Sequence, residues 1–600
     1  MKTSRRKFLK LTTASTLPIV LSPIKIISEN SQSINSESNS IKLQNLFNED
    51  FEWRKKNYPE GASSFGDKSY NSKLTDISVD AIKGRNSHSK LMLDKIKSLN
   101  KSNLSEQEKI SYDLFLQNKL SAIEGAKFNS EYLIIDQLDG PQLGFARLIQ
   151  NMPYTDLTDY ENYFARMKSF PVYVDQIIQL LKLGIETKWV QPQVPLKSVP
   201  SQIENQFVKD LEESVYYNPC KKFPKDFSES DKLKISNESK KIISEKVYPA
   251  FSKLLEFIKN TYLPNCRKNL SVLSIPNGEE YYNYSIQNRT TTKKSSREIH
   301  EIGLSEVSRI RNLMEKVIAQ VKFNGSFNEF LNFLRTDQQF YYTNAEELIS
   351  GYRNIAKRVD GELPKLFAEL PRLSYGVRAF ADYEAPAQTT ARYFPGAADG
   401  TRAGFFMANT YKLETRPKYE MEALTIHEAM PGHHLQIARG QELRNLPEFR
   451  RQGGYTAFVE GWALYSESLG EEMGFYTDPY SKFGQLTYEM WRACRLVIDT
   501  GIHAYGWSRE QSIDHMKFNS AKSENDIAVE IDRYIVWPAQ ALAYKIGELK
   551  IKELKEKAKI KLGSKFDIRK FHNAVLDNGA LPLDILENQI DKWIIEQNKS

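Results

Sequence analysis

The densest group of metal-binding residue types in this chain lies between positions 426 and 436. Only 8 His residues occur in the chain, and His427, His433 and His434 fall within eight positions, with Glu428 directly after the first. Imidazoles and carboxylates suit Zn²⁺, which in catalytic sites takes three protein ligands and leaves one position for water. A carboxylate beside such a metal can accept a proton from that water. The pattern predicts a catalytic zinc site with Glu428 as the candidate base.

The spacing of these histidines departs from a regular helical site, in which the two ligands are four residues apart. Here the fourth position after His427 is Pro431, and His433 and His434 follow at the sixth and seventh positions. The seventh position shares a face with His427 but lies about 10 Å further along a regular helix, too far for one ion. Pro431 and Gly432 interrupt the helix. A two-residue bulge there would return His433 to the ligand position, whereas a different distortion would bring His434.

A third ligand is expected from residues 458–467, an apolar stretch that contains two carboxylates. Glu460 and Glu467 are seven residues apart and would share one face of a helix. Charged side chains are rarely buried without a partner. Either carboxylate could therefore reach the cation as the third ligand. The apolar neighbours of Glu460 favour its burial.

The rest of the chain has the pattern of amphipathic helices. Residues 305–322 repeat apolar side chains at three- and four-residue steps, with charged residues between them. Similar stretches are 240–262, 344–359, 457–473 and 539–562, whereas 403–409 is the best candidate strand. No repeat or composition break divides residues 45–600. The expected fold class is mainly α, in one large domain over 45–600.

Composition and charge narrow the class of protein. Of the 600 residues, 40% are hydrophobic and 26% charged, which excludes a disordered chain and a polytopic membrane protein. The net charge is +7, and the first thirty residues contribute six basic and one acidic side chain, 6 − 1 = +5. The remainder is close to neutral, so no nucleic-acid partner is expected.

The first residues resemble an export signal. Ser4–Lys10 is basic and is followed by the apolar run Leu11–Leu21. The pair Arg5-Arg6 resembles the twin-arginine signal, so we expect a signal peptide over 1–28, a Ser/Asn-rich spacer over 29–44 and a periplasmic or otherwise exported protein. No Cys follows the run, which argues against a lipid anchor. No segment is long and apolar enough for stable membrane insertion.

Three cysteines occur, at Cys220, Cys266 and Cys494. In an exported protein Cys220 and Cys266 could form a disulfide that closes a long loop. The alternative is that all three are buried or idle thiols.

The segments His427–Gln436 and Glu460–Tyr465 resemble the bacterial domain-of-unknown-function family 885. The match extends to Arg495–His503, Asp532–Tyr534 and Pro538–Gly547. This family is similar to helical zinc peptidases of the Taq-carboxypeptidase and angiotensin-converting-enzyme type. The resemblance implies a two-lobed helical fold with a deep channel and a small sheet beside the metal site.

The resemblance also implies roles for individual residues. Zn²⁺ would be held by His427, His433 and Glu460, with Glu428 as general base. His434 would lie behind the ligands, or would be the ligand itself if the bulge is different.

In the related peptidases a His and a Tyr steady the tetrahedral intermediate as oxyanion donors do. The matching positions are His503 and Tyr544, although a His in an apolar helix is often only core and a Tyr often only packs.

Substrate-binding candidates complete the prediction. The strand around Phe406 would hold an extended peptide by backbone pairing, with Tyr393 and Arg402 beside it. Arginine matches a carboxylate with two hydrogen bonds. The cationic candidates to grip a substrate carboxylate are Arg495, Arg533 and Lys545, and each could equally form a structural ion pair.

Together these features predict an exported zinc metallopeptidase, carboxypeptidase-like, that hydrolyses short peptides with zinc-activated water and Glu428 as base. One alternative is a zinc-stabilised protein that binds peptides without cutting them. Another is a hydrolase of a non-peptide amide that uses the same site. A carboxylate that adjoins a ligand without a structural reason favours the enzyme.

Overall fold

Helices form most of the described chain, and their first residues explain where many of them begin. The computed structural model describes residues 30–64, 66–380, 385, 388–398, 400 and 402–599, so the predicted signal peptide lies outside the described residues. Four helices begin with a capping box, in which a serine side chain bonds the backbone three residues on and a Glu or Gln bonds back. The predicted fold class, mainly α with a small sheet, is confirmed.

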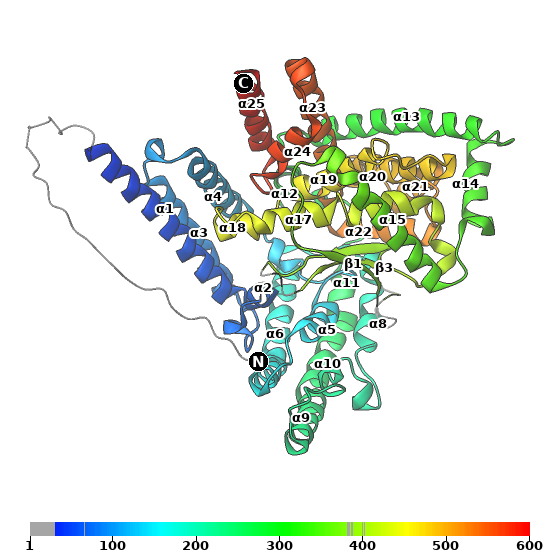
Figure 1. Cartoon of the computed structure of the whole chain (residues 1–600). Helices are drawn as coiled ribbons and strands as arrows, with labels where there is room; N and C mark the ends of the chain where they lie inside the picture. Colours follow the sequence, from blue (N-terminus) through cyan, green and yellow to red (C-terminus); the bar gives the residue numbers. More distant parts are fainter. Residues whose placement is uncertain are drawn as a thin grey trace, which may run out of the picture.

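The N-terminal helices form a layer on one side of the molecule (Figure 1). Leu43, Phe47, Met92 and Phe115 are buried together in its apolar core. Residues 30–44, expected as a spacer, are instead the first part of a helix whose Leu43 anchors it to this core. The helices of this layer are α1 (Asn30–Asn57), α2 (Pro59–Ser64), α3 (Val79–Lys97) and α4 (Glu106–Gly125).

A second group of helices projects at the lower end of Figure 1 around its own apolar core. The predicted run 240–262 is helical throughout, with one π-helical turn before α10 and one after it. The group comprises α5 (Pro141–Asn151), α6 (Leu157–Thr187), α7 (Gln193–Leu196), α8 (Val199–Glu204), α9 (Glu229–Ile242), α10 (Tyr248–Phe257) and α11 (Leu263–Asn265).

The predicted disulfide is wrong, because this second core holds Cys220 and Cys266 as free thiols. The Cys220 sulfur lies 3.0 Å from the Ser239 hydroxyl of α9. Burial raises the pKa of Cys220 to about 11 and of Cys266 to about 12, so both stay protonated. Cys494 is a free buried thiol as well.

The remaining helices surround the centre of the molecule. They include the predicted amphipathic helices as α13, α15, α19 and α23, with ends shifted by up to nine residues. The first set is α12 (Gly278–Thr290), α13 (Ser296–Gln320), α14 (Phe327–Thr336) and α15 (Ala345–Leu366). The central set is α16 (Met421–Glu428), α17 (His433–Glu442), α18 (Glu448–Arg451), α19 (Thr456–Leu469) and α20 (Pro479–Tyr505). The last set is α21 (Arg509–Asn519), α22 (Glu524–Val536), α23 (Ala543–Leu562), α24 (Ile568–Leu576) and α25 (Leu583–Lys599).

A three-stranded sheet lies beside these central helices, in the order β1-β3-β2. Strand β3 (Gly404–Ala408) is parallel to β1 (Tyr375–Ala379) and antiparallel to β2 (Ala391–Phe394). The predicted strand is therefore confirmed as β3, but both of its edges are already paired. The prediction that it binds an extended peptide is wrong for this reason, and Phe406 is fully buried against Tyr352.

No helix in the part of the chain that the structure describes has the length and apolar character needed to cross a bilayer.

Candidate metal centre

The break between α16 and α17 brings the two halves of the histidine motif together. The chain leaves α16 at Glu428, passes a cis Met430–Pro431 peptide and re-enters a helix at His433. A Cβ on Gly432 would lie 1.9 Å from the His427 carbonyl oxygen, so only glycine fits where the two backbones meet. This close approach places the start of α17 against the end of α16.

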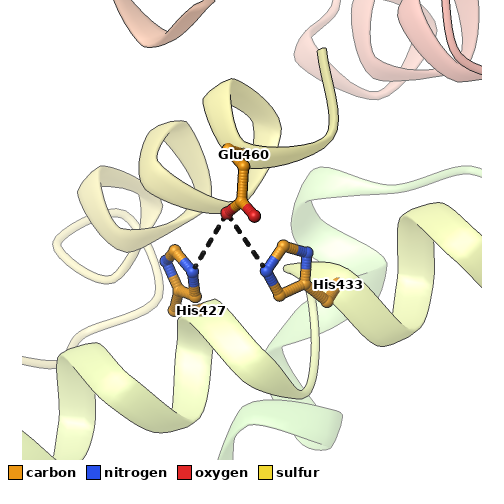
Figure 2. A group of neighbouring side chains, drawn as sticks. All are labelled: His427, His433 and Glu460. Atoms are coloured by element: carbon orange, nitrogen blue, oxygen red, sulfur yellow. Dashed lines mark ion pairs between the residues drawn. The ribbon is translucent and has the colours of Figure 1, made fainter. Parts of the chain in front are cut away.

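Three ligand atoms converge at this break (Figure 2). The Nε2 atoms of His427 and His433 lie 3.9 and 3.5 Å from Oε2 of Glu460, and the three ligand atoms all lie within 4.8 Å of one another. Tetrahedral ligands with bonds of roughly 2.1 Å to zinc would be about 3.4 Å apart. The group therefore fits a metal ion with small adjustments, and the side chains of Glu460 and His433 keep 21% and 11% exposure for a further ligand.

Electrostatics leaves His427 neutral and Glu460 ionised, as a metal needs, whereas it favours a proton on His433 that a metal would have to displace. Burial, reinforced by nearby positive charge, holds the pKa of His427 well below its usual range, so this imidazole is neutral. Burial is the largest effect on His433 and Glu460 and opposes charge on both, but their hydrogen bond and the nearby opposite charges together outweigh it. The pKa of His433 is raised and that of Glu460 is lowered, as expected for an ion pair that a cation could replace.

Glu467 holds His427 from behind and is not part of the ligand group. Its Oε1 lies 2.8 Å from Nδ1 of His427, and Arg492 lies 3.5 Å from the same oxygen. Burial raises the pKa of Glu467 to about 8, with Arg492 opposing the shift. A carboxylate that accepts the Nδ1 proton turns the Nε2 lone pair towards Glu460. Of the two acidic residues of α19, the structure therefore places Glu460 with the histidines and Glu467 behind them.

Glu428 lies beside the ligand group, where the sheet meets α16. Burial raises its pKa, and a backbone hydrogen bond from Tyr393 of β2 opposes the shift. The charges of His433 and Glu460 also act on this carboxyl group, which places it within electrostatic reach of the site. Glu428 is thus a buried carboxyl group with a raised pKa that lies next to the Tyr393 N–H.

His434 is turned away from the ligand group and ties α17 to the sheet. Its Nε2 donates to the Leu373 carbonyl at 3.0 Å, and its Nδ1 accepts from the Tyr393 hydroxyl at 2.8 Å. Both ring nitrogens are therefore used, and the alternative that His434 is the ligand does not fit. The Tyr393 side chain, expected to bind substrate, is engaged in the same contact.

The structure does not bring His503 to the site as an oxyanion donor. Its Nδ1 accepts from the Val272 N–H at 3.1 Å, and its Nε2 donates to the Tyr534 carbonyl at 3.0 Å. The ring is buried in the core of the protein, and neither nitrogen has a proton to offer a substrate. The core alternative for this histidine holds.

Two other substrate-binding candidates also have structural partners. Lys545 is fully buried and pairs with Glu306, Glu489 and Glu548 at 2.6–2.9 Å, so it is a structural ion pair. Arg402 is exposed and donates to the Pro395 carbonyl at 2.9 Å.

Arg495 and Arg533 lie within electrostatic reach of Glu460, and Tyr544 contacts both of them. Helices α19 and α23 cross where a Cβ on Gly461 would lie 2.5 Å from Gly547. Glu460 directly precedes Gly461 in α19, and Tyr544 lies one turn before Gly547 in α23. The Arg533 Nη2 donates to the Tyr544 hydroxyl at 3.3 Å, and the Arg495 guanidinium lies 4.4 Å from the centre of the Tyr544 ring.

Arg492 and Glu530 were missed at the sequence level. Each lies in a helix with many apolar residues and is buried. Arg492 pairs with Glu467, and Glu530 pairs with Arg495 and Arg533, all close to the candidate metal ligands. Single charges inside apolar helices were the available signal, but their partners lie on other helices.

Comparison with known proteins places the chain in a family. The family model described as bacterial protein of unknown function (DUF885) matches residues 59–590. The chain belongs to this family. Among curated proteins, none matches the chain.

Two solved structures resemble this DUF885 protein over most of its length. One is a protein of Colwellia psychrerythraea described as a "putative lipoprotein", with 27% identity and a TM-score of 0.86 over 93% of this chain and 100% of that one. The other, from Shewanella oneidensis, has the same description with unknown function, 18% identity and a TM-score of 0.64 over 91% of this chain and 98% of that one. The second likeness shows the fold alone.

Proposed function

We propose that this protein is an exported zinc-dependent peptidase that hydrolyses peptide bonds of short peptides. The observation that carries the proposal is the convergence of His427, His433 and Glu460 beside the buried carboxyl group of Glu428. Two imidazoles and one carboxylate are a catalytic zinc set that leaves one position open. A purely structural zinc site would be closed by a fourth protein ligand.

Glu428 and Tyr544 have different roles in the proposed reaction. Bound zinc would supply a Lewis acid that polarises the substrate carbonyl and lowers the pKa of water. Glu428, held by the Tyr393 N–H, accepts a proton from the attacking water and returns it to the leaving amine. Because the Tyr544 oxygen accepts from Arg533, its own proton is free to be donated to the carbonyl oxygen as negative charge develops there.

The position of β2 supports an extended substrate. Tyr393 stands opposite Phe406 in the β2–β3 pair, and its backbone N–H acts on Glu428 and not on β3. The outer edge of β2 therefore borders the catalytic carboxyl group. A strand edge offers an extended peptide main-chain hydrogen bonds in register.

Export is proposed from two independent observations. The C. psychrerythraea relative is described as a lipoprotein, which is a class of exported protein. The chain itself carries the basic and apolar N-terminal pattern with Arg5-Arg6. We propose the twin-arginine route, and replacement of both residues by lysine should leave the protein in the cytoplasm, since the pair is read by a receptor. Unchanged periplasmic recovery of that variant would contradict the route.

The test of the proposed function combines metal content with peptide digestion. Purified protein should carry about one zinc per chain and cut peptides from a mixed library, with activity lost to a chelator and restored by zinc. Glu428→Gln keeps the size of the side chain but removes the proton acceptor. This variant should retain zinc while hydrolysis falls by several orders of magnitude.

Three outcomes would contradict the proposal in different ways. Absence of bound metal after zinc loading removes the site. Peptide binding without hydrolysis by the parent protein indicates a binding protein. Equal hydrolysis by parent and Glu428→Gln removes Glu428 from the mechanism.

A further inference from the structure

A buried excess of positive charge lies close to the candidate metal ligands His427, His433 and Glu460. Arg495 and Arg533 share one carboxylate, Glu530, at 2.9 and 3.3 Å. Burial opposes charge on Glu530, but the two guanidinium groups outweigh it and lower its pKa to about 2, so it is ionised. Two positive charges and one negative charge leave an excess of one, and an uncompensated buried charge is unfavourable.

The hydrogen bonds of the two arginines are also incomplete. Arg495 donates to the Tyr534 hydroxyl and to Glu530, both at 2.9 Å, but its Nη1 is buried without an acceptor among the described residues. Arg533 bonds Glu530, Gln540 and Tyr544, and its Nε is buried in the same way. Guanidinium donors aimed at no protein acceptor are suited to an anion that arrives from outside.

These arginines lie within electrostatic reach of Glu460. The charges of Arg533 and Arg495 both lower the pKa of Glu460, against its burial and beside the larger effect of His433. Tyr544 contacts both arginines, and its helix α23 crosses α19, which carries Glu460, at Gly461 and Gly547. Arg533 is partly exposed, whereas Arg495 is buried beneath it. A ligand at the metal would therefore reach Arg533 first.

We infer that Arg495 and Arg533 form a recognition site, beside Tyr544, for the α-carboxylate of a peptide substrate, so that hydrolysis occurs at its carboxyl end. The inference rests on the proposed function and adds the class of substrate to it. A single carboxylate matches the excess of one positive charge, whereas a phosphate dianion would overcompensate it. Arg533 and Arg495 are specificity residues in this assignment, and Tyr544 lies between them and the bond that is broken.

The test measures binding apart from hydrolysis. The probes are N-acetylated Phe-Ala-Ala with a free carboxylate and the same tripeptide as its C-terminal amide. Calorimetry on the zinc-loaded Glu428→Gln protein should show the acid bound about 10- to 100-fold more tightly than the amide, the range for hydrogen bonds to a charged group. Adding Arg533→Gln should remove this preference.

A matched control is Arg509→Gln in the same background. Arg509 pairs with Asp532, the residue before Arg533, but it bonds none of the groups of this site. It should keep the preference for the acid. Circular dichroism and zinc content of each variant show whether it is folded and loaded, and Arg533→Lys, which keeps the charge, should retain part of the preference if the fold is intact.

The outcomes separate this inference from the proposed function. If the parent protein hydrolyses neither peptide but the acid still binds selectively through Arg533, the carboxylate site stands without the peptidase. If the parent hydrolyses acid and amide with equal kcat/KM, or if Arg533→Gln keeps the preference, the carboxylate site is wrong while the peptidase stands.

Discussion

The α16–α17 break and the end of α20 each bury a histidine in an apolar helix, yet only the first leaves a ring nitrogen for chemistry. At the break, Glu467 takes one nitrogen of His427, and the other nitrogen points at Glu460. At the end of α20, the backbone of Val272 and Tyr534 takes both nitrogens of His503. The unused ring nitrogen, and not burial, distinguishes a ligand from a core histidine.

The adjacent pair in α17 repeats this comparison on a smaller scale. His433 turns its Nε2 towards Glu460, and its Nδ1 has no acceptor or donor among the described residues. His434 uses both ring nitrogens in hydrogen bonds, to Leu373 and Tyr393, and so connects the helix to the sheet. One residue of difference in register separates the proposed metal ligand from a structural contact.

The largest expected effect comes from replacing His427 and, for comparison, His503 by alanine. His427→Ala should lose zinc and hydrolysis together, because it removes a ligand. His503→Ala should retain zinc but lower the free energy of unfolding, by about 1–3 kcal/mol for each of the two backbone groups left unpaired. Elemental analysis and urea denaturation measure both. Loss of zinc from a folded His503→Ala would break the comparison.

Sequence patterns predicted the elements but not the long-range partners. The helical periodicity of α13 and the apolar strand β3 are local properties, and both were found as expected. His503 looked like His427 because both lie in apolar helices, and the difference depends on Val272, 231 residues away. The choice between Glu460 and Glu467 likewise depends on Arg492 from another helix.

The two short strands beside β3 were missed for a related reason. Residues 375–379 and 391–394 are brief and mix Gly, Arg and aromatic residues, so neither shows a clear alternation. They become strands because β3 offers them hydrogen-bonding partners. The pairing of both edges of β3 then overturned its predicted role in peptide binding.

The next largest effect tests the support behind His427. Glu467→Gln retains a hydrogen bond to Nδ1 but removes a carboxyl group that can ionise when the metal binds. Zinc affinity should weaken by about 10- to 100-fold, as for other residues that orient a ligand. Competition with a chromophoric chelator measures this change. Unchanged affinity would mean that Glu467 contributes only to packing.

A pH dependence should follow from the His433–Glu460 pair. The pKa of His433 is raised in the metal-free protein, so zinc must displace a proton below that pKa. Zinc affinity should therefore fall by about tenfold per pH unit on the acid side and level off above the pKa. His427 adds nothing to this slope because its pKa is already well below the usual range. A flat affinity between pH 5 and about 8 would contradict the assignment of His433.

The smallest effect concerns the contact between α17 and the sheet. Tyr393→Phe removes the hydroxyl that His434 accepts from but leaves the backbone N–H that holds Glu428. Unfolding free energy should fall by about 1–3 kcal/mol while zinc content stays the same. Tyr411→Phe, at an exposed position beyond β3, is the control and should be neutral. Zinc loss in Tyr393→Phe would show that the sheet supports the metal site more directly.

The most direct test of the account compares zinc content in His433→Ala and His434→Ala. Both variants remove one imidazole from adjacent positions of the same helix, so their general effects on folding can be compared by circular dichroism. The account predicts that His433→Ala loses its zinc and that His434→Ala keeps about one ion per chain. Retention of zinc by His433→Ala, or its loss from a folded His434→Ala, would contradict the assignment of ligands.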